Sequence, residues 1–286
     1  MSDTKVWFVT GCSTGFGREL ARHLLESGHK VVVTARDAAK VQDLADINKD
    51  NALAIELDVT NKDQVSSAVE QAASHFGRID VLINNAGFGY FGAIEESGEV
   101  EVRSMFETNF WGLAGMTRSV LPLMRKQKSG FIVNISSIGG FVGFPGVGYY
   151  NATKFAVNGF SEALNKEVKP LGIKVILVQP SGFRTDWAGR SASDAETTIG
   201  DYAETAGANK ENIRGYSGNQ PGDPVRAAKA IVQAVESEDP PFNLFLGRAA
   251  LKNARLKIDE IKSETDVWAK TSEGADFPEA ERAQSN

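Results

Sequence analysis

The chain has 286 residues and a formal net charge of −6, with an isoelectric point of about 5.3. This acidic balance argues against nucleic acid or an anionic membrane surface as the main partner. A single cysteine excludes an internal disulfide framework, and the three scattered histidines lack metal-ligand spacing, so we expect no metal site.

Apolar runs of strand length alternate with helical stretches along the chain. Continuous apolar character is typical of strands buried on both faces. The predicted strands are residues 5–10, 31–34, 53–57, 79–83, 131–135, 175–178 and 242–246. The predicted helices are residues 15–27, 37–45, 62–76, 100–125, 150–168 and 224–236. Seven strands with crossover helices predict a single α/β domain over residues 1–286, a doubly wound parallel Rossmann sheet with helices on both faces.

The first strand runs into a glycine-rich turn, Gly11-Cys12-Ser13-Thr14-Gly15-Phe16-Gly17, and then into an amphipathic helix. Strand, turn and helix start in this order build a phosphate cradle, because glycine lets the backbone approach a pyrophosphate and the helix N-terminus offers free N–H groups. The pattern predicts that a dinucleotide binds here. We interpret Cys12 as a small packing residue rather than a nucleophile.

Two segments break the alternation. Residues 188–223 are rich in small and polar residues and follow the sixth strand, on the edge where such sheets bind ligands. We predict a substrate lid rather than a loose insertion. The pattern of residues 248–270 predicts a C-terminal helix that covers the domain or a neighbouring subunit. Residues 272–286 are predicted to form a frayed tail. One face of this helix carries Leu251, Ala254, Ile258, Ile261 and Trp268.

Tyr150 and Lys154 lie four residues apart in a predicted helix and therefore point to the same side. An isolated phenol has a pKa near ~10, and a neighbouring positive charge lowers that pKa toward a value useful for general acid–base catalysis. We expect Lys154 to have this effect on Tyr150. On its own the pattern is more often a surface pair, so its weight comes from the motifs around it.

Four motifs in this order resemble the compact, single-domain branch of the short-chain dehydrogenase/reductases. They are residues 10–17, Asn84-Asn85-Ala86-Gly87, the region of Ser137, and Tyr150-x-x-x-Lys154. The resemblance covers about residues 4–247 and implies a nicotinamide-dependent oxidoreductase. Residues 179–186 and the C-terminal helix are similar to the subgroup that resembles hydroxysteroid or retinol dehydrogenases.

The resemblance implies a catalytic set of Ser137, Tyr150, Lys154 and Asn109. Tyr150 would exchange a proton with the substrate oxygen, and Ser137 would hydrogen-bond that oxygen. Lys154 would also bind the nicotinamide ribose, and Asn109 would hold a water that links the lysine to solvent. Ser136 is the alternative to Ser137, since only one of two neighbouring strand residues points into a site. The alternative role for Asn109 is a buried side chain that bonds a helix kink.

The end of the second strand favours NADP(H) over NAD(H). An acidic residue there binds the ribose 2′-hydroxyl of NAD, whereas the 2′-phosphate of NADP needs positive charge. By alignment with the family pattern, the chain has Ala35 at this position and then Arg36, whose guanidinium suits a phosphate, although Asp37 is adjacent. NAD(H) remains the alternative. The cofactor set implied by the resemblance is Gly11, Ser13, Gly15, Phe16, Gly17, Arg36, Asp58, Val59, Asn85, Ala86, Gly87, Tyr150, Lys154, Pro180, Phe183 and Thr185.

One departure from the family pattern lies after the sixth strand. The family usually has Pro-Gly there, whereas this chain has Pro180-Ser181 and then Gly182. Serine puts the usual backbone path over the nicotinamide in question. Because Thr185 keeps its place, we still expect the nicotinamide carboxamide to bind Thr185 and the backbone near Phe183.

Aromatic and apolar residues in loops at the carboxyl edge of the sheet indicate an apolar pocket. They are Phe88, Tyr90, Phe91, Phe141, Val142, Phe144, Tyr149 and Trp187. The predicted function is an NADP-dependent oxidoreductase that transfers a hydride between nicotinamide and a hydrophobic secondary alcohol, ketone or aldehyde, with Tyr150 as general acid/base. The alternative is a non-catalytic NADP-binding sensor. A third class, cofactor-recycling epimerases or dehydratases, is disfavoured by its different glycine spacing.

Beyond the small substrate, the resemblance implies a homodimer or homotetramer that assembles through the helices starting at Val100 and Tyr150. No secretory leader is recognised before the first strand, and no apolar run is long enough to cross a bilayer. We therefore expect no membrane span and a cytoplasmic location.

Overall fold

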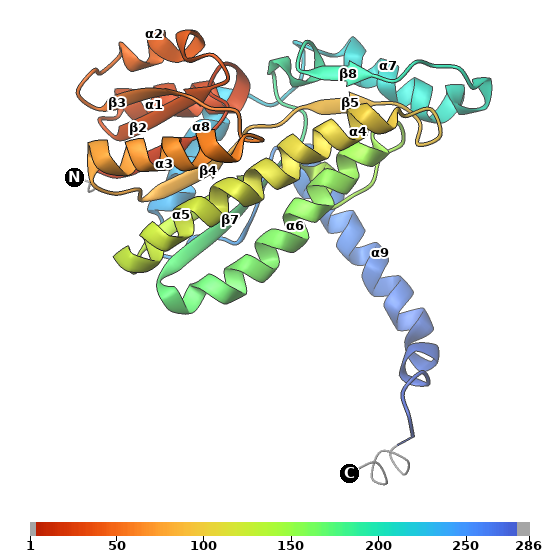
Figure 1. The fold of residues 1–286 in the computed structure, drawn as a ribbon. Coiled ribbons are helices and arrows are strands. Elements are labelled where there is room, and N and C mark those ends of the chain that lie inside the picture. Colours follow the sequence, from red (N-terminus) through yellow and green to blue (C-terminus); the bar gives the residue numbers. More distant parts are fainter. Residues whose placement is uncertain (1–3, 279–286) are drawn as a thin grey trace.

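The computed structural model describes residues 4–278, which fold around one parallel sheet with strand order β3-β2-β1-β4-β6-β7-β9 (Figure 1). The strands are β1 (Val6–Val9), β2 (Lys30–Ala35), β3 (Ala52–Glu56), β4 (Val81–Asn84), β6 (Gly130–Ile135), β7 (Ile173–Pro180) and β9 (Asn243–Leu246). Every neighbouring pair is parallel. The predicted seven-stranded, doubly wound sheet is confirmed.

Helices cover both faces of the sheet. One face packs against α1 (Gly15–Glu26), α2 (Gln42–Ala45) and α8 (Pro224–Glu236), and the other against α3 (Lys62–Phe76), α5 (Leu113–Gln127) and α6 (Gly148–Val168). Within β1, Trp7 and Val9 belong to the first apolar core and Phe8 to the second. Successive strand side chains point to opposite faces, so a strand between two helical layers is apolar throughout.

Residues 188–223, which we call the cap, contain more secondary structure than their composition suggests. β8 (Ala192–Asp194) pairs in parallel with β5 (Gly89–Phe91), and the pair forms a second small sheet that the sequence did not predict. A 3₁₀ turn (Gly200–Tyr202), a π-helical turn (Ala203–Gly207) and α7 (Ala208–Gly215) follow. Figure 1 shows the cap beside β5 at one edge of the molecule.

Two predicted helices are divided. The helix expected over residues 37–45 is a 3₁₀ turn (Ala38–Val41) followed by α2. The helix expected over residues 100–125 is α4 (Glu99–Phe106), a π-helical turn (Glu107–Gly112) and then α5. At this turn the backbone closely approaches the neighbouring loop, because a Cβ on Gly112 would lie 2.6 Å from Val59 Cγ2. The remaining 3₁₀ turns are Ile138–Gly140, Lys169–Leu171 and Asp186–Ala188.

The last helix, α9 (Arg248–Glu273), begins against the body and then projects away from it (Figure 1). Ala250 and Ala254 pack beside Ile138, whereas no α9 side chain beyond Ala254 is buried. Within residues 4–278, no helix has the length and apolar character needed to cross a membrane. The same residues contain no cluster of three or more histidine, cysteine, aspartate or glutamate side chains that could hold a metal ion.

Candidate active site

The glycine-rich turn after β1 has the backbone geometry of a phosphate cradle. Gly11 and Gly15 have φ of 73° and 60°, a region that glycine enters without steric cost. A Cβ on Gly17 would lie 2.4 Å from the Gly11 carbonyl oxygen, so only glycine fits at the start of α1. At the N-terminus of α1 the turn offers backbone N–H groups to an anion, whereas the Cys12 N–H is already bonded to the Thr34 carbonyl oxygen.

Thr10 fixes this turn to the end of β4. Its Oγ1 accepts hydrogen bonds from the backbone N–H of Asn85 (2.9 Å) and Ala86 (3.1 Å). The Asn85 amide in return donates to the carbonyl oxygens of Thr10 (2.9 Å) and Gly11 (3.0 Å). The two predicted cofactor motifs are thus locked together by Thr10, a residue absent from the predicted cofactor set.

Cys12 in the same turn is fully buried, and its Sγ donates to the Val9 carbonyl oxygen at 3.2 Å. Burial raises the pKa of this thiol to about 12. The thiolate is therefore not populated at neutral pH, in agreement with a packing role.

Ser137 and Tyr150 meet beyond the end of β6. Ser137 caps the 3₁₀ turn Ile138–Gly140, its Oγ accepts from Gly139 N at 2.9 Å, and its side chain hydrogen-bonds Tyr150. Ser136 turns the other way, because its Oγ donates to Asn158 Oδ1 at 2.5 Å. Of the two serines, only Ser137 hydrogen-bonds the Tyr150 phenol.

Lys154 lies one helical turn after Tyr150, and both side chains are buried. Its Nζ donates to the Ile135 carbonyl oxygen at 2.8 Å and lies 5.8 Å from the centroid of the Tyr150 ring. Burial lowers the pKa of Lys154 to about 8. Burial also raises the pKa of Tyr150 to about 12, although the hydrogen bond to Ser137 opposes this rise. The expected lowering by Lys154 is therefore wrong for this site, where desolvation is the larger effect.

Asn109 lies in the π-helical turn and is buried. Its Oδ1 accepts from Phe88 N at 2.9 Å, and its Nδ2 donates to Phe88 O at 2.9 Å and to Thr153 Oγ1 at 3.3 Å. Thr153 Oγ1 donates in turn to the Tyr150 carbonyl oxygen at 2.8 Å. The Asn109 side chain thus connects the loop after β4 to the helix that carries Tyr150. Its role in holding a water remains a prediction.

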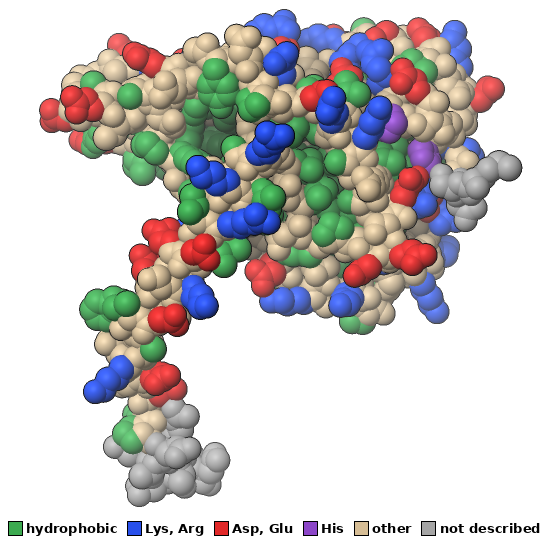
Figure 2. All heavy atoms as spheres, turned by 180° about the vertical axis from the view of Figure 1, so that it is seen from behind, with side chains coloured by type: hydrophobic (Ala, Val, Ile, Leu, Met, Phe, Trp, Pro, Cys, Tyr) green, Lys and Arg blue, Asp and Glu red, His purple; other side chains and the backbone are tan. Residues whose placement is uncertain are grey.

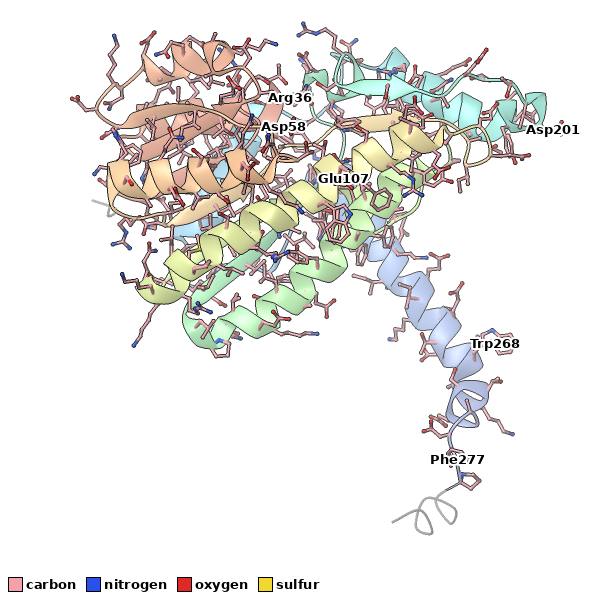
Figure 3. The ribbon with its side chains drawn as sticks, viewed as in Figure 1. Arg36, Asp58, Glu107, Asp201, Trp268 and Phe277 are labelled. Carbon is pink, nitrogen blue, oxygen red and sulfur yellow. The ribbon has the colours of Figure 1, made fainter. Side chains whose placement is uncertain are left out.

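Arg36 and Asp58 lie at the same edge of the sheet, just after β2 and β3 (Figure 3). The Arg36 side chain is exposed, and no ion pair within residues 4–278 involves it. Asp58 Oδ1 accepts from Thr60 N at 2.9 Å and Thr60 Oγ1 at 2.7 Å, which fixes the carboxylate. An unpaired guanidinium at this edge is free to bind a phosphate.

The loop after β7 approaches the glycine-rich turn from the other side. The rings of Phe16 and Phe183 meet edge to face at 5.0 Å, and a Cβ on Gly15 would lie 3.5 Å from Thr185 Cβ. Ser181, the departure from the family pattern, donates its Oγ to the Leu246 carbonyl oxygen at 3.4 Å. The serine is thus tied to β9. Ser13, Gly87 and Pro180 also lie at this carboxyl edge of the sheet.

An aromatic cluster covers Tyr150. The Trp187 ring lies 4.9 Å from the Tyr150 ring and 5.3 Å from the Phe91 ring, centroid to centroid. Most of the predicted pocket residues belong to this cluster: Phe88, Tyr90, Phe91, Phe144, Tyr149 and Trp187. Phe141 and Val142 pack instead beside Ile138 and the start of α9.

Arg214, on α7, holds the cap together. Its guanidinium donates to the carbonyl oxygens of Ala188 (3.0 Å), Gly189 (2.5 Å) and Ala192 (2.9 Å), and it forms an ion pair with Asp194 at 2.7 Å. It also lies 4.7 Å from the centroid of the Phe91 ring. Sequence reasoning did not single out Arg214, because each of these partners is distant along the chain.

Comparison with known proteins gives a consistent group of relatives. A family model described as short chain dehydrogenase matches residues 5–196. Oxidoreductase BOA17 of Botryotinia fuckeliana is 37% identical over 270 residues, which cover 94% of this chain and 98% of the relative. A 3-ketodihydrosphingosine reductase of Bacteroides thetaiotaomicron is 43% identical over 244 residues, which cover 85% of this chain and 88% of the relative. A 17-beta-hydroxysteroid dehydrogenase type 6 of Rattus norvegicus is 36% identical, with 76% and 67% covered.

Solved structures agree with this group. A short-chain dehydrogenase from Streptomyces avermitilis is 42% identical, with a TM-score of 0.89 over 96% of this chain and 100% of that one. A Burkholderia phymatum short chain dehydrogenase/reductase in complex with NAD has a TM-score of 0.80 at 26% identity, with 92% and 95% covered. ElxO with NADP bound has a TM-score of 0.71 at 28% identity, with 87% and 99% covered. Both nicotinamide cofactors thus occur among the structural relatives.

Proposed function

Because the chain belongs to the short-chain dehydrogenase/reductase family, we propose that it is an NADP-dependent oxidoreductase acting on a hydrophobic secondary alcohol, ketone or aldehyde. The observation that carries the proposal is the contact of Ser137 with the buried Tyr150 phenol, one helical turn from Lys154 and beneath an aromatic cluster. The nicotinamide supplies or accepts the hydride when it is bound.

Tyr150 is the proton donor for carbonyl reduction and the proton acceptor for alcohol oxidation. Its pKa of about 12 keeps the phenol protonated at neutral pH, and this is the form that donates a proton in carbonyl reduction. Ser137 hydrogen-bonds the same oxygen as negative charge develops there. Lys154, whose Nζ lies 5.8 Å from the centroid of the Tyr150 ring and is held by the Ile135 carbonyl oxygen, is the proposed donor to the nicotinamide ribose. Asn109 and Thr153 hold the helix that positions Tyr150.

The residues at the carboxyl edge fit a dinucleotide. The Gly11–Gly17 turn fits a pyrophosphate because Gly17, where a Cβ would lie 2.4 Å from the Gly11 carbonyl oxygen, lets the start of α1 pack directly on the turn. The preference for NADP rests on Arg36, an exposed guanidinium after β2 where an acidic residue would instead suit NAD. The loop around Phe183 and Thr185 adjoins the turn and is the proposed support for the nicotinamide carboxamide.

A hydrophobic substrate is supported by the aromatic side chains around Tyr150 and by the names of two relatives, a 3-ketodihydrosphingosine reductase and a 17-beta-hydroxysteroid dehydrogenase. The first name denotes a ketone and the second a secondary alcohol. We propose that the cap closes over such a substrate, with Trp187 and Phe91 as the wall next to Tyr150.

The test is the loss of NADPH absorbance with a panel of apolar ketones and aldehydes, for wild type and Tyr150→Phe. The variant keeps the ring against Trp187 but lacks the proton, so turnover is expected to fall about 10²- to 10⁴-fold with little change in melting temperature. Tyr149→Phe is the matched control and is expected to retain the proton-transfer step. Wild-type turnover that survives in Tyr150→Phe would contradict the assigned role of Tyr150.

A further inference from the structure

The outer part of α9 exposes large apolar side chains. Leu251, Ile258, Ile261 and Trp268 are 43%, 52%, 47% and 62% exposed. Figure 3 shows Trp268 on the part of the helix that projects from the body, and Figure 2 shows the same projection from behind. In water, most of the stability of a protein helix comes from packing of its amphipathic face. This face of α9 therefore needs a partner.

The apolar positions of α9 have the spacing of a coiled coil. Residues 251, 254, 258, 261, 265 and 268 are separated alternately by three and four positions, as the a and d positions of a heptad are. They hold Leu, Ala, Ile, Ile, Thr and Trp. A seam of this kind is complementary to a second helix with the same repeat.

We propose that α9 pairs with α9 of a second copy of this chain in an antiparallel coiled coil. The two-fold axis crosses the helix between Asp259 and Glu260, the middle of the seam. Each a position then faces a d position of the partner. Leu251 packs against the partner's Trp268, and Ile258 packs against the partner's Ile261. Ala254 is already covered by Ile138 of its own body and therefore marks the inner edge of the seam.

The charges along α9 select the antiparallel arrangement. Residues 248–258 carry four basic side chains and no acidic one, whereas residues 259–273 carry five carboxylates and two lysines, a net charge of −3. An antiparallel pair sets the basic half of each helix beside the acidic half of the other. A parallel pair would instead set like charges side by side.

The charged residues that flank the apolar seam also favour the antiparallel pair. Lys257, which pairs within its own helix with Glu260 at 2.9 Å, faces the partner's Glu264 in the antiparallel pair. In a parallel pair it would face the partner's Lys262. On the other flank of the antiparallel pair, Arg255 lies near the partner's Lys262, which is a contact between like charges. Each of these two basic residues has an aspartate four positions later on its own helix that offsets the repulsion: Asp259 follows Arg255, and Asp266 follows Lys262.

The pairing also brings the partner close to the substrate side of the molecule. Ala250 and Ala254 pack beside Ile138, Phe141 and Phe144, in the loop that follows Ser137. The partner's Trp268, opposite Leu251, therefore lies beside this loop. The second copy would cover apolar surface next to the proposed pocket.

Disulfide trapping tests both the pairing and its direction. The native Cys12 is buried with a raised pKa, so it stays silent under mild oxidation. The double variant Leu251→Cys/Trp268→Cys is expected to form a covalent dimer, whereas each single variant is not, because identical residues lie about 25 Å apart in the antiparallel pair. Ser263→Cys, opposite the seam, is the control. A dimer from Leu251→Cys alone would show a parallel pair, and no dimer from any variant would overturn the proposal.

Sedimentation equilibrium tests the apolar seam without new cysteines. Ile258→Asp is expected to raise the dissociation constant at least 100-fold, whereas Leu256→Asp, equally exposed but outside the seam, leaves it unchanged. If the chain also associates through another face, the mass of the Ile258→Asp assembly is expected to be half that of the wild-type assembly rather than the mass of one chain. Equal masses for the Ile258→Asp and Leu256→Asp variants would overturn the proposed pairing. If the wild type then also sedimented with phosphatidylcholine/phosphatidylglycerol vesicles, the partner of α9 would be a lipid surface instead.

Discussion

At the scale of single residues, one cause acts on Tyr150 and Lys154 in opposite directions. Burial disfavours the charged form of each, so the pKa of the phenol rises to about 12 and the pKa of the ammonium falls to about 8. The two groups are therefore both close to neutral in mildly alkaline solution. Their spacing was visible in the sequence, whereas their desolvation depends on the aromatic cluster and on β6, which pack around them only in the fold.

The lowered pKa of Lys154 predicts a stability change with pH. An unfolded lysine titrates near ~10.4, so between pH 8 and 10 the unfolded chain binds more protons and the folded state gains about 2 to 3 kcal/mol relative to a variant without the amine. Below pH 8 the lysine is charged in both states and this gain is absent. Above pH 10 the raised pKa of Tyr150 acts in the opposite sense, so the window ends there.

The measurement is urea unfolding of wild type and Lys154→Met across this window. Lys154→Met leaves the Ile135 carbonyl without its donor, a cost that does not vary with pH. The slope of the stability difference is therefore the readout. Lys166→Met, an exposed lysine on the same helix, should show no such slope. If the difference in unfolding free energy between wild type and Lys154→Met did not change between pH 8 and 10, a lowered pKa of Lys154 would be contradicted.

At the scale of elements, the sequence predicted the regular parts of the fold and missed the parts set by distant contacts. Strands β1, β2 and β6 match the predicted apolar runs, and α3 and α8 match the helices predicted over residues 62–76 and 224–236. The structure adds their N-caps, Asn61 and Asp223. The division of residues 100–125 by a π-helical turn has no local signal, because it depends on the contact of Gly112 with Val59 and on the bonds of Asn109 to Phe88. β5 and β8 likewise exist only as partners of each other.

The cap depends on Arg214, which predicts a local effect of its removal. Arg214→Ala loses three carbonyl contacts, the Asp194 ion pair and the contact with Phe91. Because hydrogen bonds to a charged group contribute about 1.5 to 3 kcal/mol each, opening of the cap should become at least 10-fold more frequent. The measurements are the hydrogen-exchange rate of the β5 amides and the KM for an apolar ketone. Both the rate and the KM should rise in Arg214→Ala. Arg190→Ala, an exposed cap arginine, is the control.

At the scale of the whole molecule, the cofactor edge collects residues from most of the sheet. The motifs around Gly11, Asn85 and Tyr150 could be assigned from the sequence because each is short and lies at a strand end or in a helix. The choice of Ser137 over Ser136 rested on the family resemblance, and its physical basis, the bond of Ser136 to Asn158 in α6, is visible only in the fold. Thr10 and Thr153 were missed for the same reason, since their partners lie on other elements.

Cofactor binding stabilises the folded chain as a whole, which gives a test of Arg36 that does not need a substrate. A ligand at 100 times its dissociation constant adds about 2.7 kcal/mol to the free energy of unfolding. NADPH should raise the melting temperature of the wild type more than NADH does. Arg36→Ala should weaken NADPH about 10- to 100-fold and leave NADH unchanged, since only the 2′-phosphate contact is lost. Arg103→Ala, on α4, is the control, and an equal loss for both cofactors would argue against a phosphate contact.

The hydrogen bonds of Thr10 also bear on how the chain reaches its fold. Thr10 Oγ1 is joined to the backbone of Asn85 and Ala86, 75 and 76 positions further along. Closing so long a loop costs entropy before the contact stabilises anything, and parallel sheets with such distant pairings fold slowly. During synthesis the glycine-rich turn leaves the ribosome before β4 does, and it cannot take its final geometry until β4 has emerged. A nascent chain that ends before residue 85 therefore has the nucleotide-binding motif and no nucleotide-binding site.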